Sequence, residues 1–234
     1  MAIKNHNIAK DAKIDRSKLN EAFGGRIFFE DFDDTEANNV DSTYGFDVVT
    51  SGAGTKTCQH NPSTSSAKIT AGSGGGVATV LTKNSAVWDN SKAVTFRTRM
   101  KFGPSLTNVE LQLGFADAAG MSGHADPIGD HDLAYWEYDD TTSTTWRLRT
   151  RVSGSAFVDL DTGIVVDYGT WYNLEIKILN GSVWGSIGDT EFRAVSASAT
   201  KTGSDWSTFA RVEAQASESE IVYLDTWHVS SDRS

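Results

Sequence analysis

The amino-acid sequence predicts an all-β fold, and three observations carry that prediction. Apolar residues, with Thr98 the one exception, occupy every second position from Val94 to Phe102 and again from Val109 to Phe115, a pattern typical of half-buried antiparallel strands. The composition, with 11 Phe, 7 Trp and 6 Tyr but only 3 Pro, favours strands over helices. The length of 234 residues, without a change of composition after about residue 26, favours one large domain.

Gly24-Gly25 divides the chain into an expected N-terminal arm, residues 1–25, and a body, residues 26–234. The body should begin with a strand over residues 26–34 and end with one over Glu220–Val229. Strands at both chain ends often pair, because each would otherwise leave an exposed edge. We therefore expect Ile27–Phe32 to lie beside Ile221–Val229.

Further strands are expected between these two, for a total of about a dozen. The clearest hairpin joins Trp171–Leu179 to Ser182–Ile187 through Asn180-Gly181, because both turn residues tolerate positive φ. The other expected strands cover residues 43–50, 67–70, 77–81, 93–102, 109–115, 132–138, 146–152, 156–160 and 209–216.

The opening strand, the closing strand and the hairpin of residues 171–187 together resemble the concanavalin A-like (laminin-G or lectin/glucanase) jelly roll. The resemblance is one of pattern and contains no single diagnostic motif. It implies two packed antiparallel sheets with the first and last strands side by side. It also implies glycan binding, or hydrolysis of β-glucans, as functions to consider.

The segment Ile8–Leu19 resembles segments of tailed-bacteriophage fibre and head-decoration proteins. Its aliphatic side chains are isolated among polar residues and cannot form a core alone, so they should pack on another chain. The residues concerned are Ile3, Ile8, Ile14 and Leu19. The resemblance implies contact with a major capsid protein or another virion protein, a homotrimer, and a place on the virion surface after synthesis in the host cytoplasm. A solvated tail is the alternative.

The charge distribution limits the partners. The chain has a net charge of −10, of which residues 1–20 carry +3 and the remainder therefore −13. An acidic body argues against sequence-independent binding of nucleic acid. No apolar run approaches the ~18 residues of a membrane span, and the N-terminus lacks the apolar centre of a secretory signal, so we expect no membrane insertion. Cys58 is the only cysteine and is expected to be a buried thiol.

The longest irregular region, residues 117–132, carries several side chains that could bind a metal ion: Asp117, His124, Asp126, Asp130, His131 and Asp132. Their spacing matches neither a calcium loop nor a zinc site. We expect a solvated loop, with no metal and no cofactor. A bound ion is the alternative.

The carboxylates argue against an enzyme. Glucanases of the family that the chain resembles use a Glu-x-Asp-x-x-Glu run on one strand, and this sequence has no such run. Only Glu137 and Asp139 place two carboxylates on one face of an expected strand, and Asp139 lies at a turn. The residue two places after a glutamate carries no carboxyl group at Glu110, Glu175 and Glu213. A pair assembled from different strands stays open.

Two groups of residues could form a partner surface. Trp136 and Tyr138 share one face of their expected strand and Tyr135 lies on the other, so the aromatic residues of one face could stack on a sugar ring. The alternative is that Trp136 and Tyr138 belong to the core, where large aromatic residues dominate in sandwiches. A second group consists of two basic ladders, which contain Arg97 and Arg99 on one strand and Arg147 and Arg149 on another. If these strands share a sheet, they form a cationic surface suited to an acidic partner or a glycan. Otherwise they pair with glutamates across strands.

The hypothesis that unites these features is a structural protein displayed on the surface of a tailed-phage virion as a capsid decoration, head fibre or tail fibre component. The arm would anchor it, and the body could contact host glycans. The alternative is a lectin-like carbohydrate-binding module. A glycoside hydrolase with an unusual acid pair is the third candidate, which the carboxylate spacing disfavours.

Overall fold

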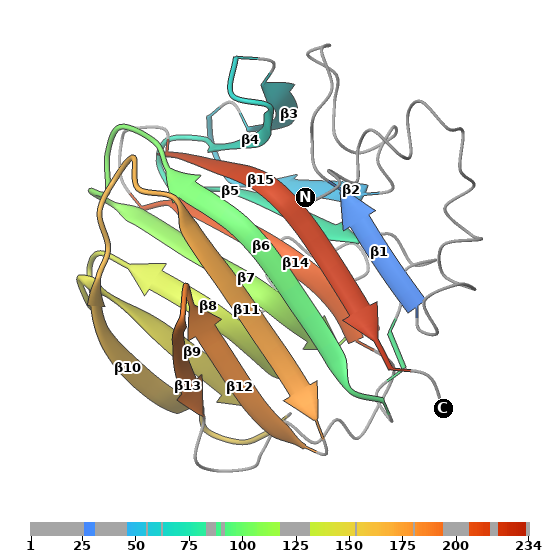
Figure 1. Cartoon of the computed structure of the whole chain (residues 1–234). Helices are drawn as coiled ribbons and strands as arrows, with labels where there is room; N and C mark the ends of the chain where they lie inside the picture. Colours follow the sequence, from blue (N-terminus) through green and yellow to red (C-terminus); the bar gives the residue numbers. More distant parts are fainter. Residues whose placement is uncertain are drawn as a thin grey trace, which may run out of the picture.

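The protein is seen here as a computed structural model that describes residues 26–30, 46–54, 56–61, 63–82, 88–89, 92–117, 132–152, 154–179, 181–193, 206–215 and 220–232. These segments form two antiparallel sheets and contain no helix, which confirms the predicted all-β sandwich (Figure 1). Within them, no helix could span a membrane. The arm of residues 1–25, with Ile3, Ile8, Ile14 and Leu19, lies outside the described residues.

One sheet has eight described strands in the order β13-β12-β11-β6-β15-β4-β3, with β1 also paired to β15. Its strands are β1 (Arg26–Glu30), β3 (Thr57–Asn61), β4 (Ser66–Ala71), β6 (Val94–Phe102), β11 (Tyr172–Leu179), β12 (Ser182–Ile187), β13 (Thr190–Arg193) and β15 (Glu220–Ser231).

The other sheet has seven described strands in the order β10-β9-β8-β7-β14-β5-β2. Its strands are β2 (Phe46–Ser51), β5 (Gly76–Thr82), β7 (Val109–Asp117), β8 (Leu133–Asp139), β9 (Thr145–Arg151), β10 (Val158–Val165) and β14 (Trp206–Ala214). In Figure 1 the eight-stranded sheet faces the viewer and the seven-stranded sheet lies behind it.

The two strongest topological predictions are confirmed. Strand β1 pairs antiparallel with β15, with Phe28 opposite Val229, so the first and last strands of the body lie side by side. Strands β11 and β12 form the expected hairpin, with Leu179 opposite Ser182. Gly181 adopts a φ of 73° in this turn, a conformation that favours glycine.

The core lies between the sheets and consists largely of aromatic side chains. Five tryptophans are at most 1% exposed: Trp88, Trp136, Trp146, Trp206 and Trp227. The Trp227 ring contacts Phe46 and Phe96 at centroid distances of 5.1 and 5.0 Å, which joins the two sheets. Its indole nitrogen donates to Thr208 Oγ1 of the seven-stranded sheet at 3.1 Å, which satisfies a buried donor.

Some element predictions need correction. Strands β3 and β13 were not expected, because their sequences, TCQHN and TEFR, lack apolar alternation. They are held by their neighbours, β4 and β12. Strand β10 extends to Val165, five residues beyond its predicted end, because its later residues still pair with β9. Cys58 is 4% exposed, which confirms the expected burial of this thiol.

Candidate functional site

Polar side chains cover the outer face of the seven-stranded sheet, the face turned away from the core. Strand register places them in rows across the sheet, because alternate residues of each strand point to one side. The first row contains Glu213, Glu110 and Asp139 on β14, β7 and β8. The second row contains Arg211, Gln112, Glu137, Arg147 and Asp161 on β14, β7, β8, β9 and β10.

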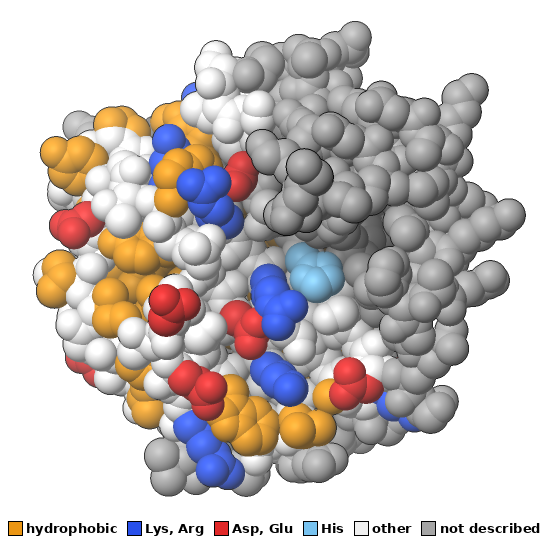
Figure 2. Space-filling view, in the orientation of Figure 1, with side chains coloured by type: hydrophobic (Ala, Val, Ile, Leu, Met, Phe, Trp, Pro, Cys, Tyr) orange, Lys and Arg blue, Asp and Glu red, His pale blue; other side chains and the backbone are white. Residues whose placement is uncertain are grey.

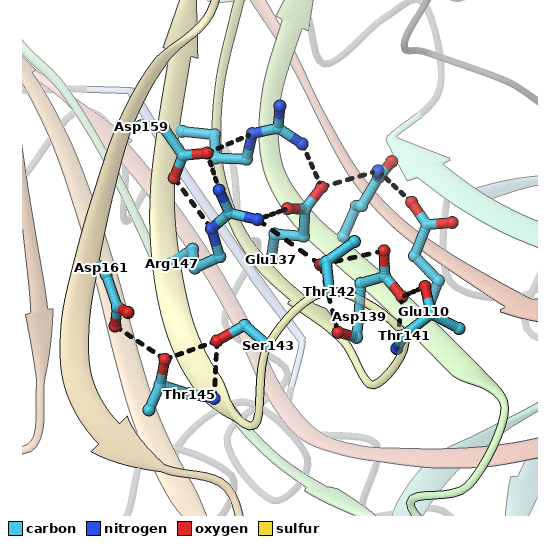
Figure 3. A network of polar contacts seen from close by, with 12 residues as sticks. Glu110, Glu137, Asp139, Thr141, Thr142, Ser143, Thr145, Arg147, Asp159 and Asp161 are labelled. Atoms are coloured by element: carbon cyan, nitrogen blue, oxygen red, sulfur yellow. Dashed lines mark hydrogen bonds and ion pairs between the residues drawn. The ribbon is translucent and has the colours of Figure 1, made fainter.

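Glu137 is the centre of this network. It is 2% exposed, and burial of a charged carboxylate is costly unless positive partners surround it. Arg149 Nη1 lies 2.7 Å from Glu137 Oε1, and Arg147 Nη1 lies 3.8 Å from Oε2. Arg147 also pairs with Asp159 through two nitrogens, so it bridges the two acids (Figure 3). Two guanidinium groups therefore balance two carboxylates, Glu137 and Asp159.

Glu110 has a different environment. Its nearest positive partner is Arg211, whose Nη1 lies 3.4 Å from Glu110 Oε1. Burial raises the pKa of Glu110 to about 7, Arg211 opposes this rise, and the negative charges of Glu213, Glu137 and Asp139 add to it. This pKa lies near neutral pH, the range that suits a general acid or base.

Gln112 joins these two glutamates. Its amide nitrogen lies 2.5 Å from Glu110 Oε1 and 3.3 Å from Glu137 Oε1, so these two oxygens are at most about 6 Å apart. Two carboxyl groups that flank a glycosidic bond lie about 5–5.5 Å apart in retaining glycosidases and about 6.5–9.5 Å apart in inverting ones. The upper limit for Glu110 and Glu137 lies between these two ranges and is closer to the retaining one.

Asp139, the predicted partner of Glu137, has another role. Its carboxylate accepts hydrogen bonds from Thr141 and Thr142 in the turn that follows β8 (Figure 3) and from Gln215. Burial alone would raise the pKa of Asp139, but these hydrogen bonds together outweigh burial and lower it. Asp139 therefore organises the turn at which the sequence placed it.

The same face is apolar at its other end. Ala116, Leu133, Tyr135 and Phe209 form a small buried cluster, and Phe157 packs against it. Arg149 connects the two ends, because its guanidinium lies 4.2 Å from the centroid of the Phe157 ring. Within the described part of the chain, the Tyr135 hydroxyl and Gln112 Oε1 are buried and make no hydrogen bond.

The structure places Trp136 and Tyr138 in the core, as the alternative interpretation stated, and Tyr135 on the opposite face of β8. Trp136 is fully buried and Tyr138 is 3% exposed, both in the core between the sheets. Neither can stack on a sugar, because stacking needs an exposed ring face. Tyr135 points to the outer face of the seven-stranded sheet and is buried in the cluster with Phe209. Of these three, only Tyr135 lies on the candidate site.

The two basic ladders lie on different sheets and do not form one surface. Arg97 and Arg99 are on β6 of the eight-stranded sheet, whereas Arg147 and Arg149 are on β9 of the seven-stranded sheet. Members of each ladder pair with acids across strands, as the alternative interpretation stated. The pairs are Arg97–Glu175, Arg99–Asp225, Arg147–Asp159 and Arg149–Glu137.

Sequence reasoning did not identify the pairing of Glu110 with Glu137, nor the parts played by Gln112 and Arg211. The sequence signal for this site was the alternation that places these polar residues on the outer side of their strands. The order of the strands in the sheet was also needed to show that the residues meet. No group of three potential metal ligands exists among the described residues. Most of the 117–132 loop, including His124 and His131, lies outside them.

No protein-family model matches this chain, and no curated protein matches it. Several solved structures are similar to this chain in fold. The carbohydrate recognition domain of Emp47p has a TM-score of 0.64 at 8% identity and covers 90% of this chain and 98% of its own. A glycoside hydrolase family protein from Mycobacterium thermorestibile has a TM-score of 0.62 at 13% identity, with coverages of 86% and 99%.

The catalytic domain of an endo-1,3-beta-glucanase (laminarinase) from Thermotoga petrophila has a TM-score of 0.62 at 12% identity and covers 90% of this chain and 99% of its own. These likenesses confirm the concanavalin A-like jelly-roll fold. They also overturn the expectation that the chain is not an enzyme, because proteins of this fold include glycoside hydrolases. The spacing argument considered one strand at a time and left open a pair from different strands, such as Glu110 and Glu137 on the adjacent strands β7 and β8.

Proposed function

We propose that this protein binds a polysaccharide on the outer face of its seven-stranded sheet and hydrolyses a glycosidic bond there with Glu110 and Glu137. The observation that carries the proposal is this carboxyl pair, which lies at most about 6 Å apart across Gln112 and whose members have unlike environments. Unlike environments give two carboxyl groups different roles at one pH.

The roles follow from the contacts. Glu110, with its raised pKa, supplies the proton to the leaving-group oxygen. Glu137, which pairs with Arg149 and Arg147, acts as the carboxylate that attacks or stabilises the anomeric carbon. In a retaining reaction Glu110 then takes a proton from the water that releases the sugar. Gln112 holds the two side chains in register.

The test is a panel of soluble β-glucans and uronate polymers, assayed for new reducing ends and for the anomer released. Glu110→Gln and Glu137→Gln should each reduce turnover by about 10²–10⁴-fold, and far-UV circular dichroism at the assay temperature should show that both variants are folded. Glu191→Gln, on β13 of the other sheet, is the matched control and should retain activity. Turnover that survives both network variants would refute these roles.

A second candidate is a lectin-like carbohydrate-binding module that uses the same face. The enclosure of Glu137 favours it, because Arg147, Arg149 and Gln112 occupy the space around its carboxylate and a nucleophile must reach its substrate. Glycan binding without new reducing ends, at saturating substrate and across pH 4–8, would select this candidate. Product formation that requires Glu110 would reject it.

We also propose that residues 1–25 anchor the chain to a virion protein as a homotrimer, with the body displayed at the particle surface. Support comes from the isolated aliphatic residues of the arm and from the resemblance of Ile8–Leu19 to phage segments. Removing residues 1–25 should abolish particle association and trimer formation while the body stays folded. A truncated chain that still associates would contradict this proposal.

A further inference from the structure

The outer face of the eight-stranded sheet holds a cavity that the proposed function does not use. Its volume is about 400 Å³, within the range of ligand pockets in proteins. Side chains from four strands meet there: Arg97 and Arg99 on β6, Asn173 and Glu175 on β11, Ser186 on β12 and His228 on β15. Figure 2 shows this face, with basic, acidic and histidine side chains gathered over the middle of the sheet.

The two arginines are held in place while part of each guanidinium stays available. Arg97 donates through Nε to Glu175, and Arg99 donates through Nη1 to Asp225 at 2.7 Å. Asp225 reaches Arg99 from a bulge in β15, where the register shifts between Leu224 and Thr226. The side chains of Arg97 and Arg99 remain 54% and 44% exposed, so their other N–H groups can contact a ligand.

Positive charge extends beyond the cavity. Among the residues that the structure describes, Lys101, Lys177 and Arg193 on this face have no acidic partner. Lys101 instead lies over two rings, 4.7 Å from the centroid of Trp171 and 5.1 Å from that of Tyr223. Arg193 lies over Trp184 at 5.3 Å. In a protein of net charge −10, this half-exposed aromatic and cationic surface favours an anionic ligand.

We propose that this cavity binds an anionic sugar unit of an acidic polysaccharide, and that it is a glycan site separate from the network of Glu110 and Glu137. Arg97 and Arg99 would hold the carboxylate or sulfate group, because a guanidinium fork fits such oxygens. Glu175 and Asn173, which line the cavity, supply acceptors for the sugar hydroxyls. A nucleic acid fits this site poorly, because its phosphates offer no donors to the Glu175 carboxylate.

The site should be tested on the full chain with four probes: a polyuronate (alginate), a sulfated glycan (heparin), a neutral β-1,3-glucan and double-stranded DNA. Calorimetry at low salt should show binding of alginate or heparin, and these two arms identify the anionic group. The double variant Arg97→Gln/Arg99→Gln should weaken that binding at least 10-fold. Arg151→Gln, on β9 of the opposite sheet, removes one positive charge elsewhere and should leave binding unchanged, whereas Arg97→Gln alone, which also removes one charge, should weaken it.

Melting temperatures within a few degrees of the wild type will show that the variants fold. Equal affinity of the wild type and the double variant for both acidic glycans would overturn the proposal, as would DNA binding at least as tight as theirs. Cleavage is an independent readout. The double variant Arg97→Gln/Arg99→Gln should lose acidic-glycan binding and still cleave a neutral substrate, which separates this site from the proposed function. Glu110→Gln should leave acidic-glycan binding at this site unchanged.

Discussion

The indole nitrogen of Trp136 donates a hydrogen bond of 3.0 Å to the backbone carbonyl of Glu175, across the interior of the sandwich. Trp136 is on β8, directly before Glu137, the centre of the network. Glu175 is on β11, and its side chain lines the cavity on the opposite face. One core contact therefore supports both outer faces, since the backbone on each side carries residues of a proposed site.

Replacing Trp136 with Phe should destabilise the protein by about 2–4 kcal/mol. The change removes a buried hydrogen bond and leaves a cavity beside Phe192, whose ring centroid lies 6.0 Å from that of Trp136. Urea denaturation measures the difference. Tyr168→Phe, at a site that is 65% exposed, should change the stability by less than about 0.5 kcal/mol. A loss below about 1 kcal/mol for Trp136→Phe would show that the contact matters little.

Gly185 gives Trp136 its space. A Cβ added at Gly185 would lie 2.4 Å from Cζ2 of the Trp136 ring, which is a steric clash because two carbon atoms cannot approach so closely. Gly185→Ala should therefore cost about 1–3 kcal/mol through overpacking. Ser186→Ala, one position away on the outer face, is the control. Combining Gly185→Ala with Trp136→Phe should cost less than the sum of the two, because the smaller ring relieves the clash. An additive result would show that the ring and the glycine are independent.

The pair of Arg149 and Glu137 should respond asymmetrically to substitution. Arg149→Met leaves the Glu137 carboxylate, whose side chain is 3% exposed, without its nearest cation and should cost about 3–5 kcal/mol. The double variant Arg149→Met/Glu137→Gln should recover part of this loss, because no isolated charge is then buried. The exposed Arg97 provides the comparison, since Arg97→Met should cost about 1 kcal/mol or less. Equal losses at the two arginines would contradict this view of the network.

Local patterns predicted most of the fold. The alternation in Val94–Phe102 marked β6, because its apolar side chains point to the core and its basic ones point to solvent. Alternation also placed Glu110 and Gln112 on the outer side of β7. It could not show that this outer side is buried, as the 0% exposure of Gln112 demonstrates. It also could not show which strands lie beside β7.

The site depended on that missing information. Gln112 meets Glu137 only because β7 and β8 pair in a register that places the two residues opposite each other. Arg211 meets Glu110 because β14, nearly 100 positions later in the chain, is the other neighbour of β7. Contacts between strands so distant in sequence depend on topology, and a search for motifs along single strands does not find them.

Glu110 should make the stability of the protein fall as the pH rises. Its pKa is about 7 in the folded chain, against an ordinary value of 4.5, so the folded state holds this proton over a range where the unfolded state has released it. Stability is therefore greatest below about pH 4.5 as far as this group is concerned, decreases between about pH 4.5 and 7, and is level above that range. The decrease should be at most about 3 kcal/mol.

Urea denaturation at pH 4.5, 6 and 8 measures this decrease. Glu110→Gln should remove the decrease, because a neutral amide cannot titrate, while Glu191→Gln should follow the wild type. If the curves of the wild type and Glu110→Gln run parallel across this range, the fold does not hold the Glu110 proton, and the role of Glu110 as a proton donor near neutral pH falls with it.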